Sequence, residues 1–423
     1  MGWGGDGDRE RGETAAVGLK PLLSALGCLL LGCARGPAPS PPPAAAGARP
    51  VAVIPFQSYG GLIYVRGVVN GDSAWLILDT GSSRTGFDRD WARTIGAVPV
   101  TAPGATAAAG GDTASVSTAV VDTFRIDGLE LRNYPVALYP LRGVSAASGR
   151  PERGFVGHDV LQRFTVEIDY QERLVRLYDP ARYRYAGSGT VVPFAADADV
   201  PLLRGSVAVR GRRPLPARLL LDTGASGLCL ILTVPFVEEH GLARAVSPAI
   251  EAPIGTGLAG ELRGTIARLE ALRLADWKIA IPTTGLGSER TGFLGRTDLD
   301  GVIGNAVFEG SRLIVEYARR RIIVEPHASV GGRCDYDMSG LRLTAQGPDL
   351  RHIMVDYVVP RSPAADAGIR VGDELLVIDG RAVADAALSE VRRVLRVNRA
   401  LRRLVLKRDA DTLRVTLRLR RLL

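Results

Sequence analysis

Apolar residues in the middle of the chain fall in short runs rich in Val, Ile and Leu, and Gly, Pro or Asp bounds each run. Runs of this kind predict strands, as at 63–69, 74–78, 118–126 and 173–177. Helical stretches are few and short, at 88–95, at 234–240 and after Gly157 and Gly304. The pattern therefore predicts a mainly β protein.

An internal repeat divides this β region. The segment at 76–83, LILDTGSS, returns at 219–226 as LLLDTGAS. Downstream, GFVGHDVL at 154–161 returns at 301–308 as GVIGNAVF, and VEIDY at 166–170 returns as LIVEY at 313–317. We therefore expect two lobes of similar plan, at residues 51–189 and 190–330.

Each copy of the repeat carries one Asp-Thr-Gly loop at the end of an apolar strand. Gly81 and Gly224 would give the two loops the backbone freedom for a sharp turn. Two such loops related by a pseudo-twofold axis would bring Asp79 and Asp222 together. Close carboxyl groups share one proton, because both cannot ionise readily. Such a pair suits hydrolysis, in which one member takes a proton from water and the other donates to a carbonyl.

On these motifs the chain resembles a retropepsin-like aspartic protease with two lobes fused in one polypeptide. The resemblance implies a mainly β fold in which two tandem β-barrel lobes form a bilobal pseudo-dimer. It makes Asp79 and Asp222 the catalytic pair, and the segments at 155–157 and 302–304 the elements that support the active-site loops from beneath. The loop residues around the pair would be Thr80, Gly81, Ser82, Thr223, Gly224 and Ala225, with the two threonines bonded across the lobe interface.

The resemblance also implies an endopeptidase that acts on protein or peptide substrates as a monomer, without a cofactor. It predicts glycine-rich flaps, for which 106–112 and 255–261 are candidates. The second spells Gly-x-Gly-x-x-Gly, but no βαβ unit surrounds it, which disfavours a dinucleotide site. Because Ser82 has a hydroxyl and Ala225 has none, we expect Ser82 to donate to Asp79 and to make Asp79 the more readily ionised member.

The last part of the chain, residues 331–423, has a different pattern. SPAADAGIRVGDELLVIDG, at 362–380, resembles a bacterial PDZ domain of the permuted kind. The resemblance implies that this domain binds the carboxy terminus of a peptide as an added strand. The carboxylate-binding loop would consist of Ser339, Gly340, Leu341, Arg342 and Leu343.

The amino terminus resembles a lipoprotein signal. The apolar run at 22–34 is too short to span a membrane and is typical of the hydrophobic region of a signal peptide. The residues before Cys33 resemble a bacterial lipobox, so we expect a signal at 1–33, lipid on Cys33 and a Pro/Ala linker at 34–50. The protein would then lie on the periplasmic side of a bacterial membrane, anchored by lipid, or free in the periplasm or secreted if the lipobox is not used.

The charge and the cysteine content disfavour some classes of function. The net charge is +8, but residues 391–423 alone carry +10, so the rest of the chain is close to neutral and a nucleic-acid role is disfavoured. Cys-x-x-Cys and His-x-x-x-His spacings do not occur, so we expect no metal site. Cys229 and Cys334 could form a disulfide in an oxidising periplasm, although two separately buried thiols are favoured.

Two other functions remain open at this point. Actin-like phosphotransferases also have paired Asp loops, but they need long helices that the middle region lacks. The other alternative is a non-catalytic scaffold whose protease-like lobes only hold a peptide.

Overall fold

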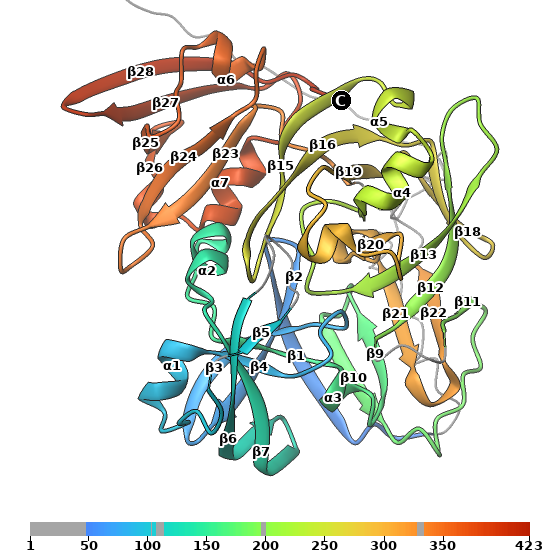
Figure 1. The fold of residues 1–423 in the computed structure, drawn as a ribbon. Helices are drawn as coiled ribbons and strands as arrows, with labels where there is room; N and C mark the ends of the chain where they lie inside the picture. The colour runs from blue at the N-terminus through green and yellow to red at the C-terminus, as the bar shows by residue number, and fades with distance from the viewer. Residues whose placement is uncertain (1–47, 103, 107–113, 196–199, 328–333) are drawn as a thin grey trace, which may run out of the picture. The chain divides into compact units, whose positions relative to one another are not determined.

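The computed structural model describes residues 48–102, 104–106, 114–195, 200–327 and 334–423 (Figure 1). The predicted signal at 1–33, most of the 34–50 linker and the first flap candidate, apart from Thr106, lie outside the described residues. All described residues belong to one compact unit.

The described part of the first lobe is built almost entirely of strands, with three short helices. Its elements are β1 (Ala52–Tyr59), β2 (Leu62–Val69), β3 (Asp72–Leu78), β4 (Gly86–Asp88), α1 (Arg89–Thr94), β5 (Gly104–Thr106), β6 (Ala114–Ile126), β7 (Leu129–Tyr139), α2 (Arg142–Ser148), β8 (Gly154–Val156), α3 (His158–Leu161), β9 (Thr165–Asp169) and β10 (Leu174–Tyr178).

The second lobe repeats this plan. Its elements are β11 (Thr190–Pro193), β12 (Leu202–Ala208), β13 (Leu215–Asp222), β14 (Leu230–Leu232), α4 (Val234–Glu239), α5 (Leu242–Ala245), β15 (Ala249–Gly257), β16 (Gly260–Arg268), β17 (Ala271–Leu274), β18 (Trp277–Ala280), β19 (Thr283–Gly287), η1 (Gly292–Gly295), β20 (Gly301–Gly304), η2 (Asn305–Val307), β21 (Ser311–Glu316), η3 (Tyr317–Arg319) and β22 (Arg321–Pro326).

The carboxy-terminal domain has its own sheet and its own apolar core. Its elements are β23 (Leu341–Gln346), β24 (His352–Val358), α6 (Pro363–Asp366), β25 (Glu374–Ile378), β26 (Arg381–Ala382), η4 (Val383–Asp385), α7 (Leu388–Val394), β27 (Leu401–Arg408) and β28 (Asp411–Arg418). Among the strands that the structure describes, β23 is an edge strand of this sheet and pairs with β24.

One sheet joins the two lobes. β9 of the first lobe pairs antiparallel with β21 of the second, and β10 and β1 extend the sheet on one side while β22 and β11 extend it on the other. Every residue of β9 and β21 is buried. The lobes are therefore held as a pseudo-dimer by main-chain pairing as well as by a shared core.

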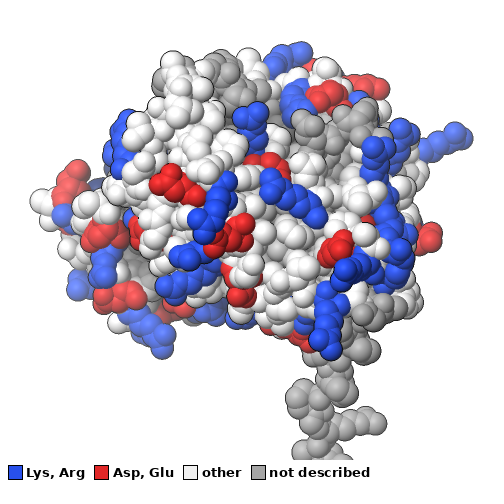
Figure 2. All heavy atoms as spheres, turned by 90° about the horizontal axis from the view of Figure 1, so that it is seen from below, with Lys and Arg blue, Asp and Glu red and all other residues white. Residues whose placement is uncertain are grey.

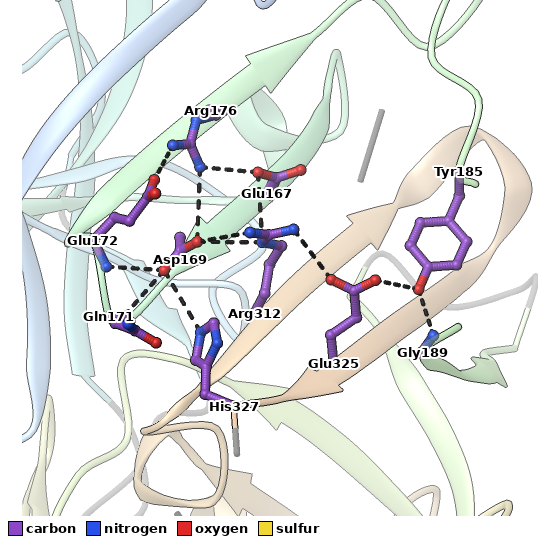
Figure 3. Close-up of polar contacts among 10 residues, drawn as sticks. All are labelled: Glu167, Asp169, Gln171, Glu172, Arg176, Tyr185, Gly189, Arg312, Glu325 and His327. Atoms are coloured by element: carbon purple, nitrogen blue, oxygen red, sulfur yellow. Dashed lines mark hydrogen bonds and ion pairs between the residues drawn. The ribbon is translucent and has the colours of Figure 1, made fainter. Parts of the chain in front are cut away.

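The joining sheet also buries charge (Figure 3). Arg312, only 2% exposed, donates to Asp169 at 3.2 Å and to Glu325 at 3.2 Å. Arg176 donates to Glu167 at 3.0 Å. Burial raises the pKa of Glu167, and the two guanidinium groups act in the opposite direction. The cluster is stable only as a set, because a buried charge without its partner is costly.

The observed elements agree with the sequence pattern in most of the lobes. The helix expected at 88–95 is α1, whose first turn is capped by the Asp88 side chain, and the helix expected at 234–240 is α4. The short helices after Gly157 and Gly304 are α3 and η2. Helices α2 and α5 were not predicted, because neither segment has a clear apolar stripe.

The structure corrects the expectation for the cysteines. Cys229 and Cys334 form a disulfide, with Cα atoms 5.7 Å apart, a separation within the range that disulfides require. Sequence separation gave no reason to pair them, since the bond links residues 105 positions apart. It ties the segment that leads into the carboxy-terminal domain to the second lobe.

The described ranges contain neither a membrane-spanning helix nor a cluster of metal-binding side chains. No helix there is long and apolar enough to cross a membrane. No group of three or more His, Cys, Asp or Glu side chains in the same ranges is placed to hold a metal ion.

Candidate active site

The two Asp-Thr-Gly loops begin where β3 and β13 end. Each strand pairs in parallel with the apolar-Gly strand of its own lobe, β8 or β20. The N–H of Asp79 donates to the Val156 carbonyl at 3.0 Å. The apolar-Gly segments thus lie beside the loops and fix the main chain from which the two carboxyl groups project.

The two threonines hold the loops together across the lobe interface. The Thr80 hydroxyl donates to the Leu221 carbonyl at 2.9 Å, and the Thr223 hydroxyl donates to the Leu78 carbonyl at 2.6 Å. Each hydroxyl also accepts the N–H of the other threonine at 3.1 Å. Both residues are fully buried, so all four bonds are shielded from water and fix the separation of the loops.

The two loop glycines are required by crowding. Neither Gly81 nor Gly224 has a positive φ, so the backbone freedom that we expected them to supply is not used. A Cβ on Gly81 would lie 2.5 Å from Cγ of Asp222, and a Cβ on Gly224 would lie 2.5 Å from Cγ of Asp79. Each carboxyl group therefore lies against the main chain of the opposite loop.

The two carboxyl groups form one acid pair. Burial raises the pKa of Asp79, while hydrogen bonds from Asp222, Gly81 and Ser82 act in the opposite direction. Burial raises the pKa of Asp222 further, and the negative charge of Asp79 adds to the rise. The pKa is raised for both carboxyl groups, so the two share one proton that belongs to the pair.

The expected role of the Ser82 hydroxyl is wrong. It donates to the Arg84 carbonyl at 2.9 Å, so it is directed away from Asp79. The donors to Asp79 Oδ1 are the N–H groups of Gly81 and Ser82, each at 2.9 Å. The second loop has an equivalent bond from Gly224 N–H to Asp222 Oδ1 at 2.8 Å. Ionisation of Asp79 is therefore favoured by main-chain donors, which a Ser82→Ala change would leave in place.

Equivalent positions after the apolar-Gly segments pack across the lobes. His158 lies edge-on against Tyr317, with ring centroids 5.0 Å apart. Its counterpart Asn305 accepts from the hydroxyl of Tyr170 and donates to the Gly61 carbonyl at 2.8 Å. Each partner tyrosine belongs to the opposite lobe. These contacts join the two lobes directly after the apolar-Gly segments.

A cavity of about 1480 Å³ contains the acid pair. Its wall includes Tyr139 and Phe155 from the first lobe, and Ile254 and Phe293 from the second. Strands β15 and β16 form a hairpin whose tip, Gly257 opposite Gly260, is the second flap candidate. The cavity is large enough for a peptide, and apolar and polar side chains both line it around the two acids.

The same cavity extends to the carboxy-terminal domain. Leu341, Arg342 and Leu343 of the predicted carboxylate-binding loop are among its lining residues. The N–H groups of Ser339 and Gly340 donate to Asp337 Oδ1 at 2.8 and 2.6 Å. Two donors of this loop therefore already hold a carboxylate from the chain itself.

These features define the fold of a retropepsin-like aspartyl protease. Two β lobes present paired Asp-Thr-Gly loops, and a domain with an edge strand beside a helix follows them.

Family comparisons agree with this description. The aspartyl protease family matches residues 65–160, which lie in the first lobe and include Asp79. The PDZ domain family matches residues 354–408. A search of curated proteins found no match. The chain therefore has the architecture of a retropepsin-like aspartyl protease followed by a PDZ domain.

Figure 2 shows one face of the molecule, seen from below relative to Figure 1. Basic and acidic side chains are interspersed on it with uncharged residues. On the right of this view several basic side chains lie together, with acidic side chains beside them.

Proposed function

We propose that this protein is an aspartic endopeptidase that uses Asp79 and Asp222 to hydrolyse peptide bonds. One observation carries the proposal: each carboxyl group lies only 2.5–2.9 Å from the position that a Cβ of the opposite loop glycine would take. Burial raises the pKa of both carboxyl groups, which means that it disfavours their ionised forms. A scaffold that only held peptides would have no need for two acids in such a place.

The acid pair supports the following reaction. Ionised Asp79 takes a proton from a water molecule placed between the carboxyl groups, and the oxygen of that water attacks the carbonyl carbon of the substrate. Protonated Asp222 donates its proton to the carbonyl oxygen, which gives a neutral tetrahedral diol. The diol then collapses: the proton held by Asp79 moves to the leaving nitrogen, and Asp222 takes back a hydroxyl proton. The pair thereby regains its single shared proton.

The test is cleavage of a random peptide library by the purified protein, with fragments identified by mass spectrometry. Asp79→Asn and Asp222→Asn should each reduce the rate by about 10²-fold to 10⁴-fold or more, the range for loss of one acid–base group. Asp122→Asn is the matched control, because Asp122 is an exposed first-lobe carboxylate. Cleavage that survives either loop substitution would overturn the assignment. No cleavage by the unsubstituted protein from acidic to neutral pH would favour the peptide-holding scaffold.

We also propose a location for the protein. Lipid on Cys33 would hold it on the periplasmic side of a bacterial membrane, with residues 34–50 as a spacer. The sequence before Cys33 supports this proposal. Metabolic labelling with a radioactive fatty acid should label the unsubstituted protein and leave Cys33→Ala unlabelled. Equal labelling of both proteins would rule out the anchor.

A further inference from the structure

A first-lobe helix lies against the PDZ domain at the place where a peptide would bind. Helix α2 lies beside β23, next to α7 (Figure 1). Arg392 of α7 donates from Nη2 to the Ala147 carbonyl of α2 at 2.7 Å and to the Leu343 carbonyl of β23 at 2.5 Å. Gly149, directly after α2, is so close to Leu388 that a Cβ would lie 2.5 Å from the Leu388 Cβ.

Helix α2 covers the edge of the PDZ sheet that β23 forms. A peptide that adds a strand to β23 needs the main-chain groups of this edge and the space between β23 and α7. Arg392 already bonds the Leu343 carbonyl, and Asp337 already accepts from Ser339 and Gly340 of the carboxylate-binding loop. The chain thus occupies its own binding groove with a helix and a carboxylate.

Helix α2 is fixed to the first lobe at its start and at its middle. Leu141, just before the helix, is 2% exposed, and its N–H donates to Asp88 Oδ2 at 3.1 Å. Ser145 Oγ accepts from the Glu152 N–H at 2.9 Å, and Glu152 accepts from the Tyr64 hydroxyl at 2.7 Å. The helix therefore cannot leave the groove without strain on the first lobe.

The PDZ domain, in contrast, is fixed to the second lobe. The Cys229–Cys334 disulfide ties its leading segment there. Arg342 donates to Thr256 Oγ1 at 2.7 Å, and the Tyr357 hydroxyl donates to the Glu251 carbonyl at 3.0 Å. Both second-lobe partners lie on β15, the first strand of the flap hairpin. Apolar packing adds to these bonds, since the Val359 side chain belongs to the same cluster as hairpin residues.

The contact between α2 and the PDZ domain therefore joins the two lobes across the cavity that holds the acid pair. Val144, Ala147 and Ser148 of α2 line that cavity, as do Arg392 and Leu343. We propose that this contact is an autoinhibitory latch, and that a peptide with a free carboxy-terminal carboxylate opens it by replacing α2 in the groove. Opening separates the PDZ domain and flap hairpin from the first lobe and admits substrate. This inference rests on the proposed protease function.

Binding can be tested without proteolysis. In protein that carries Asp79→Asn, Gly149→Ala should push α2 off Leu388 and increase retention of a random peptide library with free carboxylates by about tenfold, as expected for a crowded contact. Gly96→Ala is the matched control: its φ of +77° is close to the +79° of Gly149, but nothing lies within 4 Å of its added Cβ. The control should bind like the parent, and an amidated library should bind to neither.

A second measurement needs no change near the latch. Peptides selected by the first assay should increase hydrogen exchange of residues 141–149 in the Asp79→Asn protein. In the fully active protein they should accelerate cleavage of an amidated substrate that cannot enter the groove. Equal peptide retention by Gly149→Ala and Gly96→Ala, together with unchanged exchange at 141–149, would overturn the latch. If the latch responds but no substrate is cleaved, the protease function has failed instead.

Discussion

Gly81→Ala is the sharpest test of the paired carboxyl groups. The added Cβ would lie 2.5 Å from Asp222 Cγ and 2.8 Å from both of its carboxyl oxygens, whereas ordinary contacts are 3.4–4 Å. The Asp222 carboxyl must therefore retreat by about 1 Å, and a misplacement of about 1 Å in an active site can cost about 10²-fold in rate. Overpacking in so tight a contact should also reduce the free energy of unfolding by about 1–3 kcal/mol.

Two assays measure these effects. Initial rates on a peptide substrate should show the loss mainly in kcat, because the substitution displaces a reacting group. Urea titration followed by circular dichroism gives the change in unfolding free energy. Gly224→Ala should behave in the same way, since its Cβ would meet Asp79 at the same 2.5 Å. Gly143→Ala, with nothing within 4 Å of its Cβ, is the control. An unchanged kcat in both loop variants would refute the close approach of the acids.

The remaining predictions concern stability. Asp222→Asn should stabilise the fold increasingly as the pH rises above about 4, the usual pKa of a carboxyl group. Because the pKa of Asp222 is raised in the folded protein, the folded state holds a proton that the unfolded chain releases, and the unsubstituted protein loses stability as the pH rises. Arg312→Met should lower the unfolding free energy by about 3–5 kcal/mol, because Asp169 and its neighbours would stay buried without their partner; a loss below about 1 kcal/mol in urea titration would contradict this. Reduction of the Cys229–Cys334 disulfide, which closes a separation of 105 residues, should cost about 2–5 kcal/mol, and Cys334→Ser should be insensitive to the reductant.

Much of the fold and the centre of the site were predictable because they depend on local pattern and repetition. Strands, short helices and sharp loops follow from residues that are neighbours in the chain. The repeat required two similar lobes, and the Asp at each strand end required the acids to meet if the lobes paired. For the same reason, the resemblance to a PDZ domain could be recognised from one segment of sequence, 362–380.

Other features depend on residues far apart in the chain. The expectation that Gly81 supplies backbone freedom was wrong, because the atoms that leave no room for a Cβ belong to Asp222 in the other lobe. Ser82 was assigned to the wrong bond for a local reason, since its hydroxyl donates to the carbonyl of Arg84, two residues further along the chain. Contacts between distant segments also produce the disulfide, the buried charges of β9 and β21, and the packing of α2 against the PDZ domain.

The sequence by itself thus determined the mainly β lobes, their duplication, the two acids and the PDZ domain. Only the tertiary structure decided how closely each acid approaches the opposite loop, which main-chain groups donate to it, and what occupies the PDZ groove. The physical reason is that strand pattern and turn chemistry act between near neighbours, whereas burial, carboxyl pairing and domain contacts exist only after distant parts of the chain have packed together.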